Sequence, residues 1–228
     1  MTSSREGENA FPVYLIMVLP DIESYKKDPC GTLSIPYYKA KEIEIPEGVA
    51  VVHERDYDPA AYEGYSDEPY FRLIHRLKPA AAPESGAFSV RTAGEDDIPL
   101  IADMICRSYR DIGVSEDQLK TMRASSVFDG ELWVIAYDNV KGLPAACGIA
   151  ELDRETGEAS LEWIQTLPES RRMGAGRLVV LTLLSRLIGK AGFVTVSGRA
   201  NDPLEPKMLY RNCGFEGEDV WHVLRRSR

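Results

Sequence analysis

Residues 158–200 constrain the fold more than any other part of the chain. Two β-rich runs, EASLEWIQTLP and FVTVSGRA, are separated there by the basic, glycine-broken stretch ESRRMGAG and by the aliphatic stretch LVVLTLLSRLIGKAG. The aliphatic stretch has the length and apolar content of a helix, and Gly189 and Gly192 mark its end. We therefore expect a strand, a loop, a helix and a second strand in this order.

Strand and helix signals alternate over the rest of the C-terminal part as well. Acids at 95–97 favour the start of a helix that runs to about Tyr109, and Ser115 opens a second helix to about Ser126. Proline residues lead a short helix within PLEPKMLYRN. Alternating or β-rich runs predict the remaining strands, at 88–93, 131–138, 143–153 and after Cys213. The order β, α, α, β, β, β, α, β, α, β, with a meander at 131–168, predicts an α+β domain with one mixed, mostly antiparallel sheet.

The stretch KPAAAPESGA is typical of a linker, because alanine, proline, serine and glycine cluster there without apolar periodicity. It divides an N-terminal accessory segment, residues 1–85, from a C-terminal domain, residues 86–228. In the accessory segment we expect strands at 13–20, 49–58 and 70–77, the last two as a hairpin, and no long helix. The segment is thus predicted to be a small α/β or β-rich unit of unknown role.

Charge and cysteine usage exclude several classes of protein. A formal net charge of -9 argues against nucleic-acid binding, which needs a basic surface. The four cysteines are scattered and the three histidines lie far apart, so we expect no metal and reduced thiols in a cytoplasmic protein. The apolar run at 13–19 is far shorter than the about 20 residues of a membrane span, and MTSSREGENA is unlike a signal peptide.

The loop before the aliphatic helix has the chemistry of an anion site. The first N–H groups of a helix lack partners within the helix, and they carry the positive end of its dipole. Gly174 and Gly176 let the backbone approach a ligand closely, while Arg171 and Arg172 are expected to add mobile positive charge. The loop lacks the Lys-Ser/Thr ending of a P-loop. A turn that happens to be basic is the alternative.

Two motifs together resemble the GNAT acetyltransferase superfamily. Arg171-x-x-Gly174-x-Gly176 lies between a strand and an aliphatic helix, and LYRNCGF follows at 209–215. GNAT proteins share an Arg/Gln-x-x-Gly-x-Gly/Ala loop for the pyrophosphate of acyl-coenzyme A, and a Leu-Tyr-x-x-x-Gly-Phe segment near the end. The resemblance covers about Phe88 to Arg226. Within this range, the residues around the two motifs are similar to those of bacterial members that have an added N-terminal segment. It implies the GNAT fold, in which two adjacent strands splay apart into a slot for acetyl-coenzyme A.

The resemblance also implies which residues hold the coenzyme. Backbone groups of the strand that precedes the loop would pair with the pantetheine arm, and loop amides would surround the pyrophosphate. Family members often carry an asparagine about seven residues before the tyrosine, whereas Asn201 lies nine residues before Tyr210. The cofactor-binding residues expected in this chain are Gln165, Thr166, Leu167, Arg171, Arg172, Met173, Gly174, Ala175, Gly176, Arg177 and Asn201.

Acetyl transfer to an amine needs a base for the ammonium and an acid for the leaving thiolate. Tyr210 matches the family tyrosine and is the candidate acid. Glu162 is the candidate base, because the expected strand places it between apolar neighbours that would desolvate its carboxylate. Regular alternation would put Ser160, Glu162 and Ile164 on one face of that strand. His222 is a weaker candidate base, and the thiols of Cys147 and Cys213 are expected to be buried and structural.

The expected function is an acetyl-coenzyme A-dependent N-acetyltransferase that transfers the acetyl group to a primary amine by direct attack. The acceptor is a small-molecule amine or a peptide amine, whose identity the sequence leaves open. A noncatalytic acyl-coenzyme A-binding regulatory or interaction module is the alternative. In a third reading, the accessory segment completes the acceptor pocket, and its acidic patches attract a polyamine, an aminoglycoside or a basic peptide. Dimers are common in the family, so a homodimer also stays open.

Overall fold

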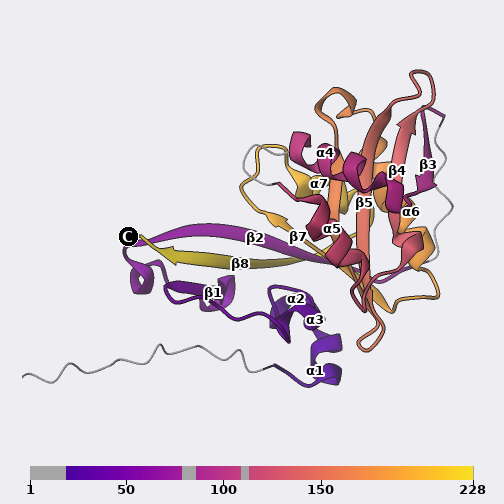
Figure 1. The fold of residues 1–228 in the computed structure, drawn as a ribbon. Helices are drawn as coiled ribbons and strands as arrows, with labels where there is room; N and C mark the ends of the chain where they lie inside the picture. The colour runs from indigo at the N-terminus through magenta and orange to yellow at the C-terminus, as the bar shows by residue number, and fades with distance from the viewer. Residues whose placement is uncertain (1–18, 79–85, 109–112, 228) are drawn as a thin grey trace, which may run out of the picture.

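The computed structural model describes residues 19–78, 86–108 and 113–227, and its core is an eight-stranded sheet with helices on both faces (Figure 1). The strands lie in the order β1-β8-β2-β7-β6-β5-β4-β3, and neighbours are antiparallel except for β6 and β7. The strands are β1 (Val49–His53), β2 (Tyr65–His75), β3 (Phe88–Thr92), β4 (Trp133–Asp138), β5 (Pro144–Asp153), β6 (Glu158–Thr166), β7 (Phe193–Arg199) and β8 (Glu216–Arg226).

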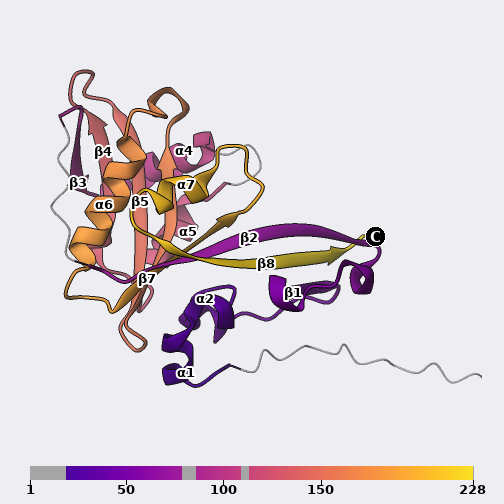
Figure 2. The same ribbon diagram turned by 180° about the vertical axis from the view of Figure 1, so that it is seen from behind.

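Helices cover both faces of the sheet. α4 and α5 pack on one face, and α6 and α7 lie on the other (Figures 1 and 2). The α-helices are α1 (Ile22–Lys27), α2 (Pro29–Thr32), α3 (Tyr37–Ala40), α4 (Ile98–Ser108), α5 (Glu116–Arg123), α6 (Ala175–Leu187) and α7 (Pro206–Arg211). Within the described residues, no helix has the length and apolar character needed to cross a membrane.

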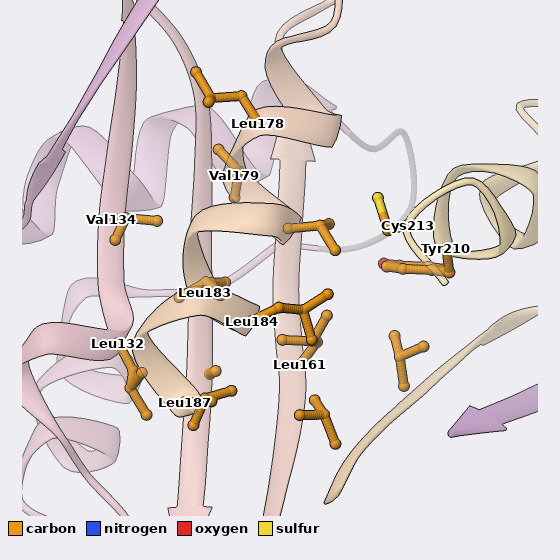
Figure 3. Packing of buried hydrophobic residues seen from close by; sticks show 14 of the residues in the cluster. Leu132, Val134, Leu161, Leu178, Val179, Leu183, Leu184, Leu187, Tyr210 and Cys213 are labelled. Atoms are coloured by element: carbon orange, nitrogen blue, oxygen red, sulfur yellow. The ribbon is translucent and has the colours of Figure 1, made fainter. Parts of the chain in front are cut away.

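The largest core lies between α6 and the sheet. Aliphatic side chains from the inner side of α6, among them Val179, Leu183 and Leu187, are fully buried against residues of β4, β5 and β6 (Figure 3). Burial of such side chains contributes about 1.5–3 kcal/mol each to folding. α6 is thereby fixed on the sheet, and its N-terminus lies where β6 ends.

A second core holds α4 and α5 on the opposite face. Ile98, Ile101 and Ile105 recur at helical spacing along α4, and they are buried against the β4 and β5 residues Trp133 and Ile149. At the start of α5, the side chain of Ser115 accepts from the amide of Gln118, whose own side chain accepts from the amide of Ser115. The helix start predicted at Ser115 is thus confirmed.

The N-terminal residues join the same sheet instead of forming a sheet of their own. β2 lies between β7 and β8, and β1 lies on the outer side of β8. The hairpin predicted for 49–58 and 70–77 is therefore wrong, because β8 separates the two strands. Short helices α1, α2 and α3 precede β1. Tyr25 of α1, Tyr37 of α3 and Leu33, which follows α2, form a third core with Phe193.

The element order predicted for residues 86–228 is confirmed, as is the antiparallel meander of β4, β5 and β6. The strand expected at 13–20 and the linker centre at 79–85 lie mostly or wholly outside the described residues, and so does Tyr109. The division at residue 85 therefore stays a prediction. β2 and β8 run together away from the rest of the sheet, and the C-terminus lies at their far end (Figures 1 and 2).

Candidate active site

The only parallel strand pair among the described residues opens into a slot. β6 and β7 are paired from Glu158–Phe193 to Leu161–Val196, and neither strand is paired with the other beyond that point. A cavity of about 490 Å³ lies there, lined by residues of β2, β6, β7, α6 and α7 and by the loop before α6. The cavity therefore extends from the N-terminus of α6 to the exposed edges of two diverging strands.

The glycine-broken loop has the backbone conformation that its sequence predicts. Gly174 is the N-cap of α6 with φ of 93°, and Arg172 also has a positive φ of 62°. A glycine adopts this left-handed conformation without steric cost, whereas a residue with a Cβ is strained there. Gly176 serves a different purpose, because a Cβ at this position would lie 2.7 Å from Oγ1 of Thr166. The second glycine of the motif thus lets α6 begin directly against β6.

The three arginines of the loop region differ in their surroundings. The guanidinium of Arg171 donates to the backbone carbonyl of Thr166 at 3.3 Å and to that of Ser108 at 3.0 Å. Arg171 thereby ties the loop to β6 and to the end of α4, in contrast to the mobile charge expected from the sequence. The side chains of Arg172 and Arg177 are exposed beside the cavity that both residues line. These two carry the accessible positive charge.

The β6 residues expected to pair with pantetheine do not all face the slot. The amide of Leu167 donates to the carbonyl of Ala145 at 3.0 Å, so the backbone of Leu167 is directed toward β5. Because backbone groups alternate in direction along a strand, Thr166 is directed toward the slot and Gln165 toward β5. Thr166 and Gln165 line the cavity, whereas Leu167 is buried in the core beside α4.

Two other expected cofactor residues lie outside the cavity lining. Met173 is half exposed, and Asn201 is exposed in the turn after β7. Asn212 at the end of α7 lines the cavity, and so does Tyr70 of β2. Neither residue has a sequence signal, because Asn212 occupies one of the variable positions of the motif at 209–215 and Tyr70 belongs to the accessory segment. The cofactor roles of Met173, Leu167 and Asn201 stay predictions, as do those of the expected residues that line the cavity.

Tyr210, the candidate acid, comes from α7 and lines the cavity. Its side chain extends from α7 toward α6 and β6 (Figure 3). The ring packs against Phe71, with centroids 6.1 Å apart, and against Phe215 at 5.7 Å. Only 7% of the residue is exposed, so the phenol is held within the wall of the slot.

Glu162, the candidate base, lies in a β-bulge of β6. On β5, the consecutive residues Ile149 and Ala150 pair with Trp163 and Leu161, which leaves Glu162 without a partner residue. The bulge overturns the predicted alternation, because Leu161 and Ile164 both face the α6 core while Trp163 faces the α4 core. A bulge re-aims side chains, and it brings Glu162 to the cavity that Tyr210 also lines.

The accessory segment supplies the immediate partners of Glu162. The ammonium group of Lys39 on α3 donates to Oε2 of Glu162, and the hydroxyl of Tyr38 lies 3.5 Å from Oε1. Ser160 donates to the same Oε1 at 2.6 Å. The sequence could not indicate these contacts, since Lys39 and Glu162 are 123 residues apart.

The other nucleophile and base candidates do not fit the slot. Burial raises the pKa of Cys147 to about 12 and that of Cys213 to about 11, so both thiols are poor nucleophiles near neutral pH. His222 is not among the residues lining the cavity; its Nδ1 lies 2.9 Å from Asp67 and its Nε2 lies 2.5 Å from Glu54. The prediction of structural thiols agrees with their burial, and His222 is the wrong choice of base.

Comparisons with solved structures identify the fold. A GCN5-related N-acetyltransferase from Sphaerobacter thermophilus matches with a TM-score of 0.63 at 17% sequence identity, over 78% of this chain and 60% of that chain. An acetyltransferase from the GNAT family from Colwellia psychrerythraea matches with a TM-score of 0.58 at 14% identity, over 78% and 65%. A functionally unknown conserved protein from Staphylococcus epidermidis matches with a TM-score of 0.59 at 14% identity, over 92% and 82%.

The chain therefore has the fold of the GCN5-related N-acetyltransferases, and the fold expected from the resemblance is confirmed. It spans less than two thirds of the length of the Sphaerobacter and Colwellia chains. No protein-family model matches the sequence, and the search of curated proteins gives no match.

Proposed function

We propose that the protein is an N-acetyltransferase that moves the acetyl group of acetyl-coenzyme A to a primary amine. The observation that carries the proposal is that one cavity is lined by the N-terminus of α6, by the diverging edge of β6, by Tyr210 and by Glu162. An elongated thioester with a charged pyrophosphate end fits this combination of an anion site and an open strand edge.

The residues present fit the coenzyme in two respects. α6 has 13 residues, and its N-terminal amides at Ala175 and Gly176 border the cavity together with the exposed cations Arg172 and Arg177. The pyrophosphate would be held by these groups. The backbone of Thr166 would pair with the pantetheine arm, which would bring the thioester between Tyr210 and Glu162. Coenzyme A supplies an activated acetyl group.

The chemistry follows from these positions. Glu162 accepts a proton from the acceptor ammonium, and the neutral nitrogen then attacks the acetyl carbonyl carbon. A C–N bond forms and the C–S bond breaks, without a covalent intermediate on the protein. Tyr210 donates its phenolic proton to the departing thiolate. The accessory segment takes part through Tyr70, which lines the cavity, and through the contacts of α3 with Glu162.

A thiol-release assay with acetyl-coenzyme A tests the proposal directly. The assay would cover alkylamines, amino acids, aminoglycosides and lysine peptides, with coenzyme binding measured in parallel by calorimetry. We expect saturable thiol release with at least one amine. Tight coenzyme binding without release for any amine would favour the noncatalytic coenzyme-binding module, and absence of coenzyme binding would refute both functions.

A further inference from the structure

Each carboxylate oxygen of Glu162 already accepts a hydrogen bond from a neighbouring donor. Its Oε2 accepts from the ammonium of Lys39, and its Oε1 accepts from Ser160 at 2.6 Å. An acceptor ammonium that is to approach this carboxylate as closely as Lys39 does must take the place of one of these donors. Ser160 lies on the same strand as Glu162 and is buried, whereas the Lys39 side chain is long, flexible and 36% exposed. Lys39 is therefore the donor that can leave.

A second carboxylate shares the same ammonium. Glu151 on β5 has a side chain that is only 6% exposed, and its Oε2 lies 3.7 Å from Nζ of Lys39. The hydroxyl of Tyr38 donates to this oxygen. Burial, and next the negative charge of Glu162, raise the pKa of Glu151. One lysine thus compensates two carboxylates, of which Glu162 lines the cavity and Glu151 lies behind it on β5 without lining the cavity.

Departure of Lys39 alone would leave both carboxylates without their cation. Taking the partner from a buried ion pair is costly, because the remaining charge has lost its hydration and receives no compensation. An incoming ammonium group compensates the same two carboxylates, and a neutral nucleophile does not. Exchange of one ammonium for another is thus the least costly way to open the site.

We infer that Lys39 holds the place of the acceptor ammonium, that Glu151 is a specificity-determining residue beside Glu162, and that the acceptor is a cationic alkylamine that displaces Lys39. The inference rests on the proposed function, which it deepens by naming the charge state of the acceptor and its internal competitor. Lys39 is in this proposal a positioning residue, which acts through its contact with Glu162.

The first test compares Lys39→Met with Lys41→Met. Lys41 directly follows α3, and its exposed ammonium pairs with Glu155, so Lys41→Met is a matched loss of one positive charge. For cadaverine as acceptor, Lys39→Met should lower KM about fivefold with little change in kcat, because the competing ammonium is gone. Lys41→Met should leave KM unchanged. With methoxyamine, which is neutral at pH of about 8 where alkylamines are charged, neither variant should shift KM.

The second test changes the buried carboxylate. Glu151→Gln should raise KM for cadaverine at least about tenfold, since a charged partner of the ammonium is lost. KM for methoxyamine and the affinity for coenzyme A should stay as in the unaltered protein, which also reports that the variant is folded. An equal rise in KM for cadaverine and for methoxyamine would mean that Glu151 has a structural role, and it would overturn the part of the inference that concerns Glu151.

Calorimetric titration of cadaverine into the protein saturated with coenzyme A separates the two proposals. If the unaltered protein releases thiol with no amine, the proposed acetyltransferase function fails. The binding comparison still decides the inference, because Lys39→Met should bind cadaverine about fivefold more tightly whether or not transfer occurs. An unchanged or weaker affinity in Lys39→Met, relative to Lys41→Met, would overturn the inference.

Discussion

Arg72 of β2 donates a hydrogen bond of 3.0 Å to Glu158 of β6, and the two side chains are 1% and 0% exposed. The pair crosses β7, whose Thr195 donates to the same carboxylate oxygen at 2.6 Å. The other carboxylate oxygen accepts from the hydroxyl of Tyr25 and from the amide of Tyr37 at the start of α3. The closed end of the slot and the position of α3 thus depend on one buried carboxylate.

Arg72→Met should lower the free energy of unfolding by about 3–5 kcal/mol, because it leaves a buried carboxylate without its cation. Urea denaturation measures the effect. The double variant Arg72→Met with Glu158→Gln should recover part of the loss, since the uncompensated charge is then absent. A loss below about 1 kcal/mol in the single variant would mean that the pair does not hold the segment.

Neighbouring arginines in the loop should respond differently to truncation. Arg171→Ala removes donors to two backbone carbonyls, and it should lower the free energy of unfolding by about 1–3 kcal/mol. Arg172→Ala should leave stability unchanged and weaken coenzyme A binding several-fold, with a smaller dependence on salt, since only an exposed charge is lost. Denaturation and calorimetry on the same two proteins check this. Equal effects of the two substitutions on stability would contradict the structural role of Arg171.

Tyr210→Phe should reduce the rate of acetyl transfer at least about tenfold with little change in coenzyme affinity. The phenyl ring retains the packing against Phe71 and Phe215, so only the hydroxyl is removed. Stopped assays at saturating acetyl-coenzyme A measure the rate, calorimetry measures the coenzyme affinity, and melting temperatures report that the variant is folded. An unchanged rate would exclude Tyr210 as the acid.

His222 should make stability depend on pH. Burial lowers its pKa, but hydrogen bonds with Glu54 and Asp67 outweigh this effect, and the net pKa is raised above 6.5. The stabilisation that comes from a raised pKa in the folded state is fully present below the pKa of the unfolded chain. It is lost as pH rises through the pKa of the folded protein. The free energy of unfolding should therefore fall as pH rises above about 6.5. His222→Gln should flatten this dependence in urea titrations at several pH values, and an identical slope would refute the assignment.

Local sequence patterns were enough to predict the glycine-broken loop before α6 and most helices and strands of residues 86–227. Gly174 and Gly176 lie next to the helix and the strand that they serve, and capping at Ser115 involves residues three positions apart. Such signals are contained within a few neighbouring residues, and sequence reasoning detects them directly. The position of Tyr210 on the slot wall followed from a motif with known spacing.

Contacts between distant segments were beyond local pattern. Pairing of β2 with β7 and β8 is set by the fit of whole strand faces, and both partners lie more than a hundred residues further on. The bulge at Glu162 is invisible in the sequence, because a single unpaired residue leaves the β-rich run unchanged. The approach of Lys39 to Glu162 depends on both of these features and on the buried carboxylate of Glu158.

The place of β2 also sets an order of events during synthesis. This strand of 11 residues is made more than a hundred residues before β7 and β8, the two strands that satisfy its backbone. Until residues 193–226 have been translated, both edges of β2 lack their native hydrogen bonds, and the strand cannot join the sheet. Completion of the slot wall to which β2 contributes Tyr70 therefore waits until β7 and β8 have been made.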